Sequence, residues 1–166
     1  TVSILCYHSH RFQGAEYSNN DHIALGADLR LIRDLGRPIL PALDIVEALC
    51  GQRPWEGVAG AVAITFDDGL CLDYRGHSHK TLGNLPSFLE QLNRFDACAT
   101  SFVIASPDAR LVLESVSLGG EPMLGDDWWQ PAMADGRIAI GNHSWDHNHA
   151  SLPWRGPGIS EMGSFR

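Results

Sequence analysis

The sequence predicts an α/β protein built on a mainly parallel sheet. Short apolar runs, each of the length of a buried strand, alternate with segments in which apolar residues recur at helical spacing. Five strands are expected, and this alternation is typical of a parallel α/β fold. The 166 residues, of which 44% are hydrophobic and 19% charged, are enough to bury the core of one domain, so residues 1–166 are expected to form a single domain.

The first half of the chain is expected to contain three strands and two helices. Gly36 and Gly51 each follow an apolar pattern of helical period, at the position where a helix commonly ends. The strands are expected at residues 2–7, 37–40 and 61–66. The apolar residues of the first helix are Leu25, Leu29, Ile32 and Leu35, and those of the second are Leu43, Val46 and Leu49.

The second half adds two strands and two helices. The apolar residues between Leu85 and Phe95 form the clearest amphipathic pattern in the chain, and a second helix is expected from Asp126 until Gly136 ends it. The pattern of residues 110–125 is ambiguous. The two strands are expected at residues 99–104 and 137–141, and a Gly- and Pro-rich loop at residues 151–166.

Composition excludes several classes of partner. The formal charge is -8, with 20 acidic and 12 basic residues and no cluster of Lys and Arg, which argues against nucleic acid and anionic membrane surfaces. No apolar run approaches the roughly 20 residues of a membrane-spanning helix. Residues 1–6 carry no basic leader, so no signal peptide is visible, and the first residue is not Met.

The four cysteines are widely spaced and include no C-x-x-C pair. We expect them to be unpaired and buried, since a free thiol behaves as a small hydrophobic group. One disulfide or metal ligation are the alternatives, although the usual spacing of metal-ligating cysteines is missing. The residues are Cys6, Cys50, Cys71 and Cys98.

Polar residues stand at the ends of two of the expected strands. Asp67 and Asp68 follow the run at 61–66, and His143 and His147 follow the run at 137–141. In parallel α/β folds, ligands bind at the carboxyl ends of the strands, where residues distant in sequence converge. The sequence therefore predicts that the carboxylates and the imidazoles lie close together.

Each pair alone has an ordinary structural explanation. Asp-Asp-Gly forms a good tight turn, and two histidines four residues apart can be a capping and a surface residue. Their joint occurrence at strand ends favours a metal site instead. Two imidazoles and one carboxylate leave coordination positions open for water, as in catalytic zinc sites, and the remaining aspartate would serve as a base.

Two stretches of the sequence resemble the first two motifs of the polysaccharide deacetylase family, carbohydrate esterase family 4. They are Thr65-Phe66-Asp67-Asp68-Gly69 and His143-Ser144-Trp145-Asp146-His147. The surroundings agree at Tyr7-His8, at residues 99–104 and at Gly141-Asn142. The resemblance covers about residues 2–153.

The resemblance implies a fold, a reaction and residue roles. The fold would be a distorted (β/α) barrel like that of TIM barrels, and the reaction would release acetate from N-acetylated amino sugars of a polysaccharide or oligosaccharide. Asp67 would be the general base, and Asp68, His143 and His147 would hold a divalent metal ion, zinc in the first place and cobalt, nickel or manganese as alternatives. The family also favours an extracellular or periplasmic location.

Three further residues are candidates for substrate binding or for support of the site: Ser144, Trp145 and His8. The hydroxyl of Ser144 would orient the histidine loop, or would simply bond to the backbone of that loop. Trp145 would stack on a sugar or, more in keeping with its residue type, pack in the core.

The sequence also departs from the family. The later R-x-P, D-x-W and Leu-x-x-His motifs, the last of which brings the catalytic acid, are not found, and Arg155-Gly156-Pro157 follows His147 too closely to be the first of them. A closed eight-stranded barrel typically needs about 250 residues. We therefore expect an incomplete barrel, the N-terminal portion of the catalytic domain, with an exposed sheet edge that favours association into a homo-oligomer.

Two other functions stay open. One keeps the metal site but hydrolyses a small amide or imide. The other is a non-catalytic remnant of the fold that binds metal or carbohydrate.

Overall fold

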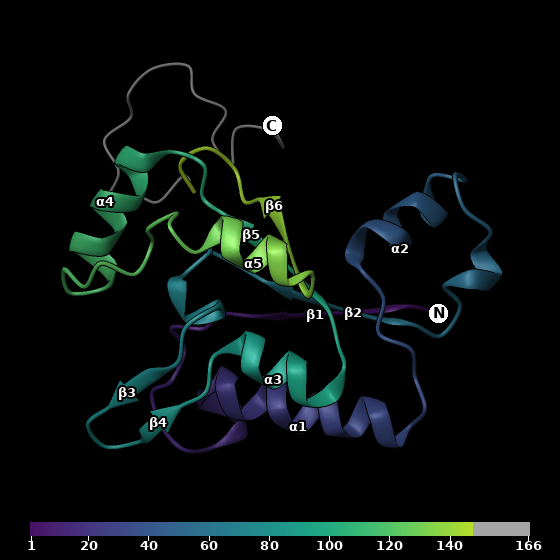
Figure 1. Ribbon diagram of the computed structural model, residues 1–166, viewed down its shortest axis with the longest axis horizontal. Coiled ribbons are helices and arrows are strands. Elements are labelled where there is room, and N and C mark those ends of the chain that lie inside the picture. The colour runs from purple at the N-terminus through teal and green to yellow at the C-terminus, as the bar shows by residue number, and fades with distance from the viewer. Residues whose placement is uncertain (148–166) are drawn as a thin grey trace.

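A parallel sheet of four strands forms the centre of the structure, a computed structural model that describes residues 1–147. The strands lie in the spatial order β1-β2-β5-β6 (Figure 1). The prediction of a mainly parallel α/β sheet is confirmed. The bounds are β1 (Ser3–Tyr7), β2 (Val62–Phe66), β5 (Ala99–Val103) and β6 (Ile138–Asn142).

The register of the sheet brings the carboxyl ends of its strands to one edge. Tyr7 pairs with Phe66, Phe66 with Ser101, and Val103 with Asn142, all in parallel. The residues that leave β1, β2 and β6 therefore start from the same edge. This is the edge at which the sequence predicts a site.

One face of the sheet is covered by α1 (Asp21–Asp34), α3 (Phe88–Phe95) and α5 (Trp129–Asp135). Ile64 and Phe66 point toward this layer, since alternate residues of a strand face the same side. The helices and the sheet share one core, with side chains that are almost fully buried. Its largest members are Trp128, Phe66, Phe88, Leu25, Leu29, Ile64, Leu92 and Ile138.

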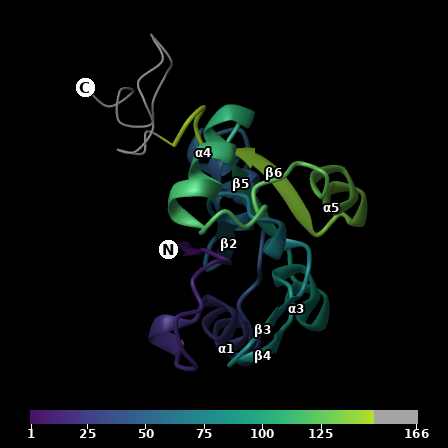
Figure 2. The ribbon, with the colours of Figure 1, turned by 90° about the vertical axis from the view of Figure 1, so that its left-hand side faces the viewer.

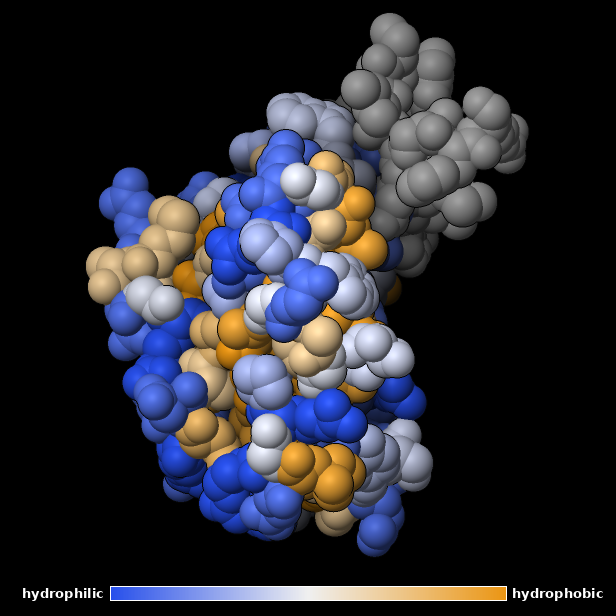
Figure 3. All heavy atoms as spheres, turned by 90° about the vertical axis from the view of Figure 1, so that its right-hand side faces the viewer, coloured by the Kyte–Doolittle hydropathy of each residue, from blue (hydrophilic) through white to orange (hydrophobic). Residues whose placement is uncertain are grey.

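The helix α2 (Ala42–Leu49) packs against the other face of the sheet and stands apart from the other helices (Figure 1). It buries Ile45 and Ala48 against Val58 and Ala63. The residues from which the helix was predicted lie on its exposed side and are 63%, 50% and 66% exposed: Leu43, Val46 and Leu49. Figure 3 shows hydrophobic patches among the polar residues on this side of the molecule.

The segment that the sequence left unassigned contains a helix, α4 (Pro107–Ser117). The Ser106 hydroxyl caps its start by accepting a hydrogen bond from the Ala109 N–H at 3.2 Å, and proline occupies the first turn, where no N–H is needed. α4 and α1 lie on opposite sides of the molecule (Figures 1 and 2). α4 packs in a second core with Leu70, Ile104 and Leu124.

A small antiparallel hairpin follows the second strand of the main sheet. It consists of β3 (His77–His79) and β4 (Gly83–Leu85) and lies beside α1 and α3 at one end of the molecule (Figures 1 and 2). The remaining elements of residues 1–147 are three short 3-10 helices, η1 (Tyr17–Asn19), η2 (Trp55–Gly57) and η3 (Cys71–Asp73).

The strand predicted at residues 37–40 forms only a single bridge between Ile39 and Val62. The Leu40 N–H donates to the Val62 carbonyl at 3.0 Å, and the Val62 N–H donates to the Pro38 carbonyl at 2.9 Å. Pro38 and Pro41 have no N–H to extend this ladder, which explains why the main sheet has four strands over residues 1–147 where five were expected. An open sheet of four strands agrees with an incomplete barrel.

All four cysteines lie in the described residues and are free thiols. The prediction of burial is wrong for Cys6 and Cys50, which are exposed. Cys6 lies on the face of β1 that no helix of the large core covers, and Cys50 ends α2.

Over residues 1–147, each helix is too short or too polar to cross a bilayer. The loop expected at residues 151–166 lies outside the described residues.

Candidate metal centre

A sharp turn at the end of β2 presents the two aspartates. All five residues of β2 are buried, and the chain then turns through Asp68 and Gly69, whose φ angles of 73° and 74° lie in the left-handed region. A Cβ at Gly69 would stand 2.6 Å from Val103 Cγ1 and 2.8 Å from Val103 Cα, so the turn fits against β5 only with glycine there. The break in the strand lets two adjacent side chains face the same edge of the sheet.

A tight loop at the end of β6 presents the two histidines. The His143 N–H donates to the Val103 carbonyl at 2.9 Å, and the loop then takes left-handed φ angles at Ser144 and His147. The Ser144 hydroxyl accepts a hydrogen bond from the His147 N–H at 3.0 Å. The Ser144 hydroxyl therefore bonds to the backbone of the loop and, through that bond, orients the loop. Both roles considered for Ser144 from the sequence thus apply.

The structure brings together the three residues expected to bind metal. The Nε2 atom of His147 lies 3.1 Å from Asp68 Oδ1, and the Nε2 atom of His143 lies 3.6 Å from the same oxygen. All three side chains are half-buried, and their ligand atoms lie within 4.8 Å of one another. These distances suit three donors that face a common point.

The surroundings of Asp68 favour its charged form. Burial alone would raise the pKa of this carboxyl, but the adjacent His147 and the charges of His8 and His10 outweigh it, so the pKa lies below its usual value. A carboxylate that stays ionised is the form that binds a cation.

The donor set fits a divalent metal ion. Asp68 Oδ1 is buried and lacks a well-aligned hydrogen-bond donor, an arrangement that is unfavourable for a carboxylate oxygen unless a cation satisfies it. Two imidazole nitrogens and one carboxylate oxygen are ligands that zinc accepts, with room left for water.

His10 is a neighbour of the site that sequence reasoning missed. Its Nδ1 atom lies 3.8 Å from Asp68 Oδ2, and burial lowers its pKa. The signal in the sequence was its position two residues after His8, in the same loop beyond β1.

His8 lies beside Asp67 and does not belong to the set of Asp68, His143 and His147. Its imidazole and the Asp67 carboxylate belong to a separate group that also contains Cys6. The ring of His8 meets that of His10 edge to face, with centroids 5.8 Å apart. His8, from the loop beyond β1, therefore lies close to Asp67, from the loop beyond β2.

Trp145 is 54% exposed, so the expectation that it packs in the core is wrong. Its carbonyl accepts a hydrogen bond from the Ser106 N–H at 2.7 Å, which ties the histidine loop to the start of α4.

A cavity of ≈ 180 Å³ opens beside the site. Asp68, His10 and His147 line one part of it, and the remaining wall is mainly aliphatic. Sequence patterns did not indicate this wall because α4 and the segment after it supply much of it. The aliphatic side chains are Leu70, Ile104, Leu113, Leu118 and Leu124.

A buried carboxyl, Asp73, lies behind the turn. The Ser101 hydroxyl donates to Asp73 Oδ2 at 2.7 Å, and the residue is fully buried. Burial raises the pKa of Asp73 to about 7, and the charges of Asp68 and Asp67 act in the same direction. Sequence reasoning did not single it out, since an aspartate after a turn is usually exposed.

The chain matches the family model described as polysaccharide deacetylase over residues 56–155, more than half of its length. The matched region contains both of the motifs on which the resemblance was based. No protein of curated function matches the chain at a significant level.

Solved structures share the fold. The deacetylase PplD of Streptococcus pyogenes, in complex with acetate, has a TM-score of 0.57 and 21% identity over 88% of this chain and 57% of that one. IcaB from Ammonifex degensii has a TM-score of 0.61 and 20% identity over 87% and 53%. A de-N-acetylase from Aggregatibacter actinomycetemcomitans has a TM-score of 0.55 and 15% identity over 89% and 56%. The chain thus spans little more than half the length of these structures, and at such identities the likeness is one of fold.

Proposed function

The chain belongs to the polysaccharide deacetylase family, and from that membership we propose that it hydrolyses N-acetyl groups of amino sugars in a glycan, with a divalent metal ion held by Asp68, His143 and His147. The observation that carries the proposal is the approach of Asp68 Oδ1 to the Nε2 atoms of both histidines, beside a second carboxylate. The S. pyogenes neighbour was solved with acetate, the product that this reaction would release.

Asp67 and Asp68 have different roles in the proposed reaction. A bound divalent ion would polarise the amide carbonyl and lower the pKa of a water molecule. Asp67 lies outside the three-residue set, and one of its carboxylate oxygens takes the proton of the attacking water as general base. Asp68 stays ionised to hold the ion, as the lowered pKa of its carboxyl favours.

The ligand types favour zinc. Imidazole and carboxylate donors also accept cobalt, nickel and manganese, so these ions are expected to substitute for it. The three-residue set contains no sulfur, so the ion would be held here through nitrogen and oxygen ligands alone.

The cavity beside the site supports an acetylated sugar as substrate. Its aliphatic wall suits the methyl group of an acetyl unit. The exposed indole of Trp145 offers a flat apolar surface for the sugar itself.

Acetate release from N-acetylglucosamine oligomers tests the proposal. The chain loaded with one equivalent of zinc is expected to release acetate. Asp67→Asn is expected to keep the zinc ion held by Asp68, His143 and His147 but to lose about 100-fold or more of the rate, because it lacks a base. Asp68→Ala is expected to lose the zinc ion held with His143 and His147, and the activity with it. The measurements are acetate by coupled assay and zinc by elemental analysis.

The control is Asp34→Asn, which removes an exposed carboxylate from α1 and is expected to change neither quantity. An unchanged rate in Asp67→Asn would remove Asp67 as the base. A wild-type chain that takes up zinc but releases acetate only from a small amide would favour small-amide hydrolysis, and one that releases none from either substrate would favour a non-catalytic module.

A further inference from the structure

A second group of metal-ligating side chains lies beside the first. Cys6, His8 and Asp67 each place one ligand atom within 4.8 Å of the others: the thiol sulfur, an imidazole nitrogen and a carboxylate oxygen. The group has no side chain in common with Asp68, His143 and His147. It therefore has a complete set of three ligands of its own.

The parallel register of β1 and β2 explains why these residues converge. Cys6 pairs with Thr65 and Tyr7 pairs with Phe66, so His8 and Asp67 are the next residues along the two strands. Side chains two residues apart on a strand point to the same face. Cys6, His8 and Asp67 consequently project from the same face, opposite to the one that packs on α1 and α3.

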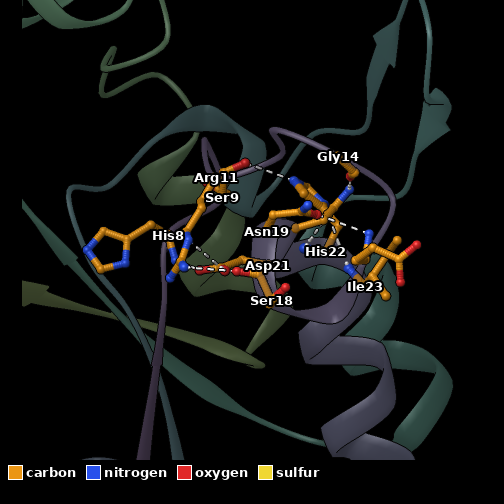
Figure 4. Close-up of polar contacts among 11 residues, drawn as sticks. His8, Ser9, Arg11, Gly14, Ser18, Asn19, Asp21, His22 and Ile23 are labelled. Atoms are coloured by element: carbon orange, nitrogen blue, oxygen red, sulfur yellow. Dashed lines mark hydrogen bonds and ion pairs between the residues drawn. The ribbon is translucent and has the colours of Figure 1, made fainter.

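Backbone hydrogen bonds hold the two loop residues in place. The His8 N–H donates to Asp21 Oδ2 at 2.8 Å, and the Asp67 N–H donates to the Tyr7 carbonyl at 3.0 Å. Asp21 in turn lies 3.8 Å from Arg11 in an ion pair. In Figure 4 the imidazole of His8 points away from this network.

The thiol of Cys6 is protonated until a cation arrives. Although the residue as a whole is exposed, partial burial of the thiol and then its hydrogen bond with Asp67 raise the pKa of Cys6 to about 12. Metal binding would form a bond between Sγ and the ion and release the thiol proton to solvent. The exposure of Cys6 and the half-buried state of the other two residues leave the group open to an entering ion.

We propose that Cys6, His8 and Asp67 form a second cation site that binds a thiophilic divalent ion such as zinc or cobalt. A thiolate and an imidazole select such ions over magnesium and calcium, which prefer oxygen ligands. Occupation of this site would tie up the Asp67 carboxylate. Excess zinc would then inhibit hydrolysis, a consequence that rests on the proposed function, whereas the binding itself does not.

Cobalt titration of the metal-free chain tests the site directly. Cobalt bound to a thiolate absorbs strongly in the near ultraviolet, and the site at Asp68 contains no sulfur and cannot give this band. The wild-type chain is expected to bind two cobalt ions and to show the band. Cys6→Ser is expected to bind one ion and to lose the band, because serine keeps the shape but not the soft ligand.

Two further variants distinguish this site from a different thiol and from the site at Asp68. Cys50→Ser removes the other exposed thiol and is expected to keep both the band and the second ion. Asp68→Ala is expected to lose one ion but to keep the band. This readout does not depend on acetate release, so a chain that shows the band without hydrolysing any glycan would contradict the proposed function alone.

Three results would overturn the second site. The first is a wild-type chain that shows no band at saturating cobalt, a result that needs no variant. The second is a band that persists in Cys6→Ser. The third is a band that disappears in Asp68→Ala, which would mean that the sulfur completes the first site instead of forming another.

Discussion

Asp67 and Asp68 are neighbours in the sequence, yet the structure assigns them to different groups of ligands. Asp68 lies in the left-handed region, at a φ angle of 73°, and faces the histidines of the β6 loop. Asp67 continues the register of β2 and faces Cys6 and His8. One residue of strand geometry followed by one residue of turn geometry is enough to separate a candidate base from a candidate ligand.

The turn depends on Gly69, and this predicts a large loss of stability in Gly69→Ala. The left-handed φ angle of 74° costs an alanine about 1–2 kcal/mol, and contact with Val103 at 2.6–2.8 Å adds about 1–3 kcal/mol of overpacking. The free energy of unfolding, measured by urea denaturation, is expected to fall by the sum of both effects.

Gly83→Ala is the matched control for this measurement. Gly83 has the same φ angle of 74°, but a Cβ there would meet nothing within 4 Å. Its loss is therefore expected to be confined to the backbone term. Equal losses in the two variants would show that Val103 does not constrain the turn.

At the scale of the elements, the helix α2 shows where an apolar pattern fails. Six of its eight residues are apolar, so apolar residues lie on both faces of the helix. Each face therefore shows apolar residues spaced three to four positions apart, and the spacing alone does not tell which face is buried. The spacing of Leu43, Val46 and Leu49 traced the exposed face, while Ile45 and Ala48 are the residues that contact the sheet.

This difference predicts a large loss of stability for a truncation at Ile45 and a small change for one at the adjacent Val46. Ile45 is 1% exposed and packs with Ala48, Val58 and Ala63, so Ile45→Ala is expected to lower the free energy of unfolding by about 2–5 kcal/mol. Val46 is 50% exposed, and Val46→Ala is expected to change it by less than about 0.5 kcal/mol. Thermal or urea unfolding decides the matter, and a larger loss for Val46→Ala would mean that α2 presents its other face to the sheet.

The helix α4 was missed for a different reason. Arg110 is 7% exposed, donates to the Ile104 carbonyl at 3.1 Å and to Asp126 Oδ2 at 3.0 Å, and lies over the ring of Trp129. A buried arginine breaks the apolar period from which helices are predicted. Only its partners, which come from other segments, make the position suitable for a charge.

Over the whole molecule, the sequence predicted where strands end but not which residues of neighbouring strands lie side by side. The apolar runs at residues 2–7, 61–66 and 137–141 each stop at a polar residue, which was enough to locate the edge of the sheet where Asp68, His143 and His147 meet. The group of Cys6, His8 and Asp67 depends on the register between β1 and β2, which the sequence alone does not state. The burial of Asp73 likewise depends on the approach of Ser101 from β5.

Asp73 links the chemistry of this edge to the stability of the whole fold. Burial raises its pKa to about 7 in the folded chain, from an ordinary value of 3.8 when the chain is unfolded. Below about pH 4 the carboxyl is protonated in both states. Between about pH 4 and 7 the folded state still holds the proton that the unfolded state has lost, so the free energy of unfolding falls as pH rises through this window.

Asp73→Asn is therefore expected to be insensitive to this part of the pH dependence, because the amide cannot ionise but can still accept the hydrogen bond from Ser101. With a chelator present, the melting temperature of Asp73→Asn minus that of wild type should rise steadily from about pH 4 to pH 7 and stay constant above about pH 7. Glu121→Gln, which neutralises an exposed carboxylate, should show no such trend. A constant difference between wild type and Asp73→Asn across the window would mean that Asp73 is ionised in the folded chain throughout, and that its burial is compensated by neighbours other than Ser101.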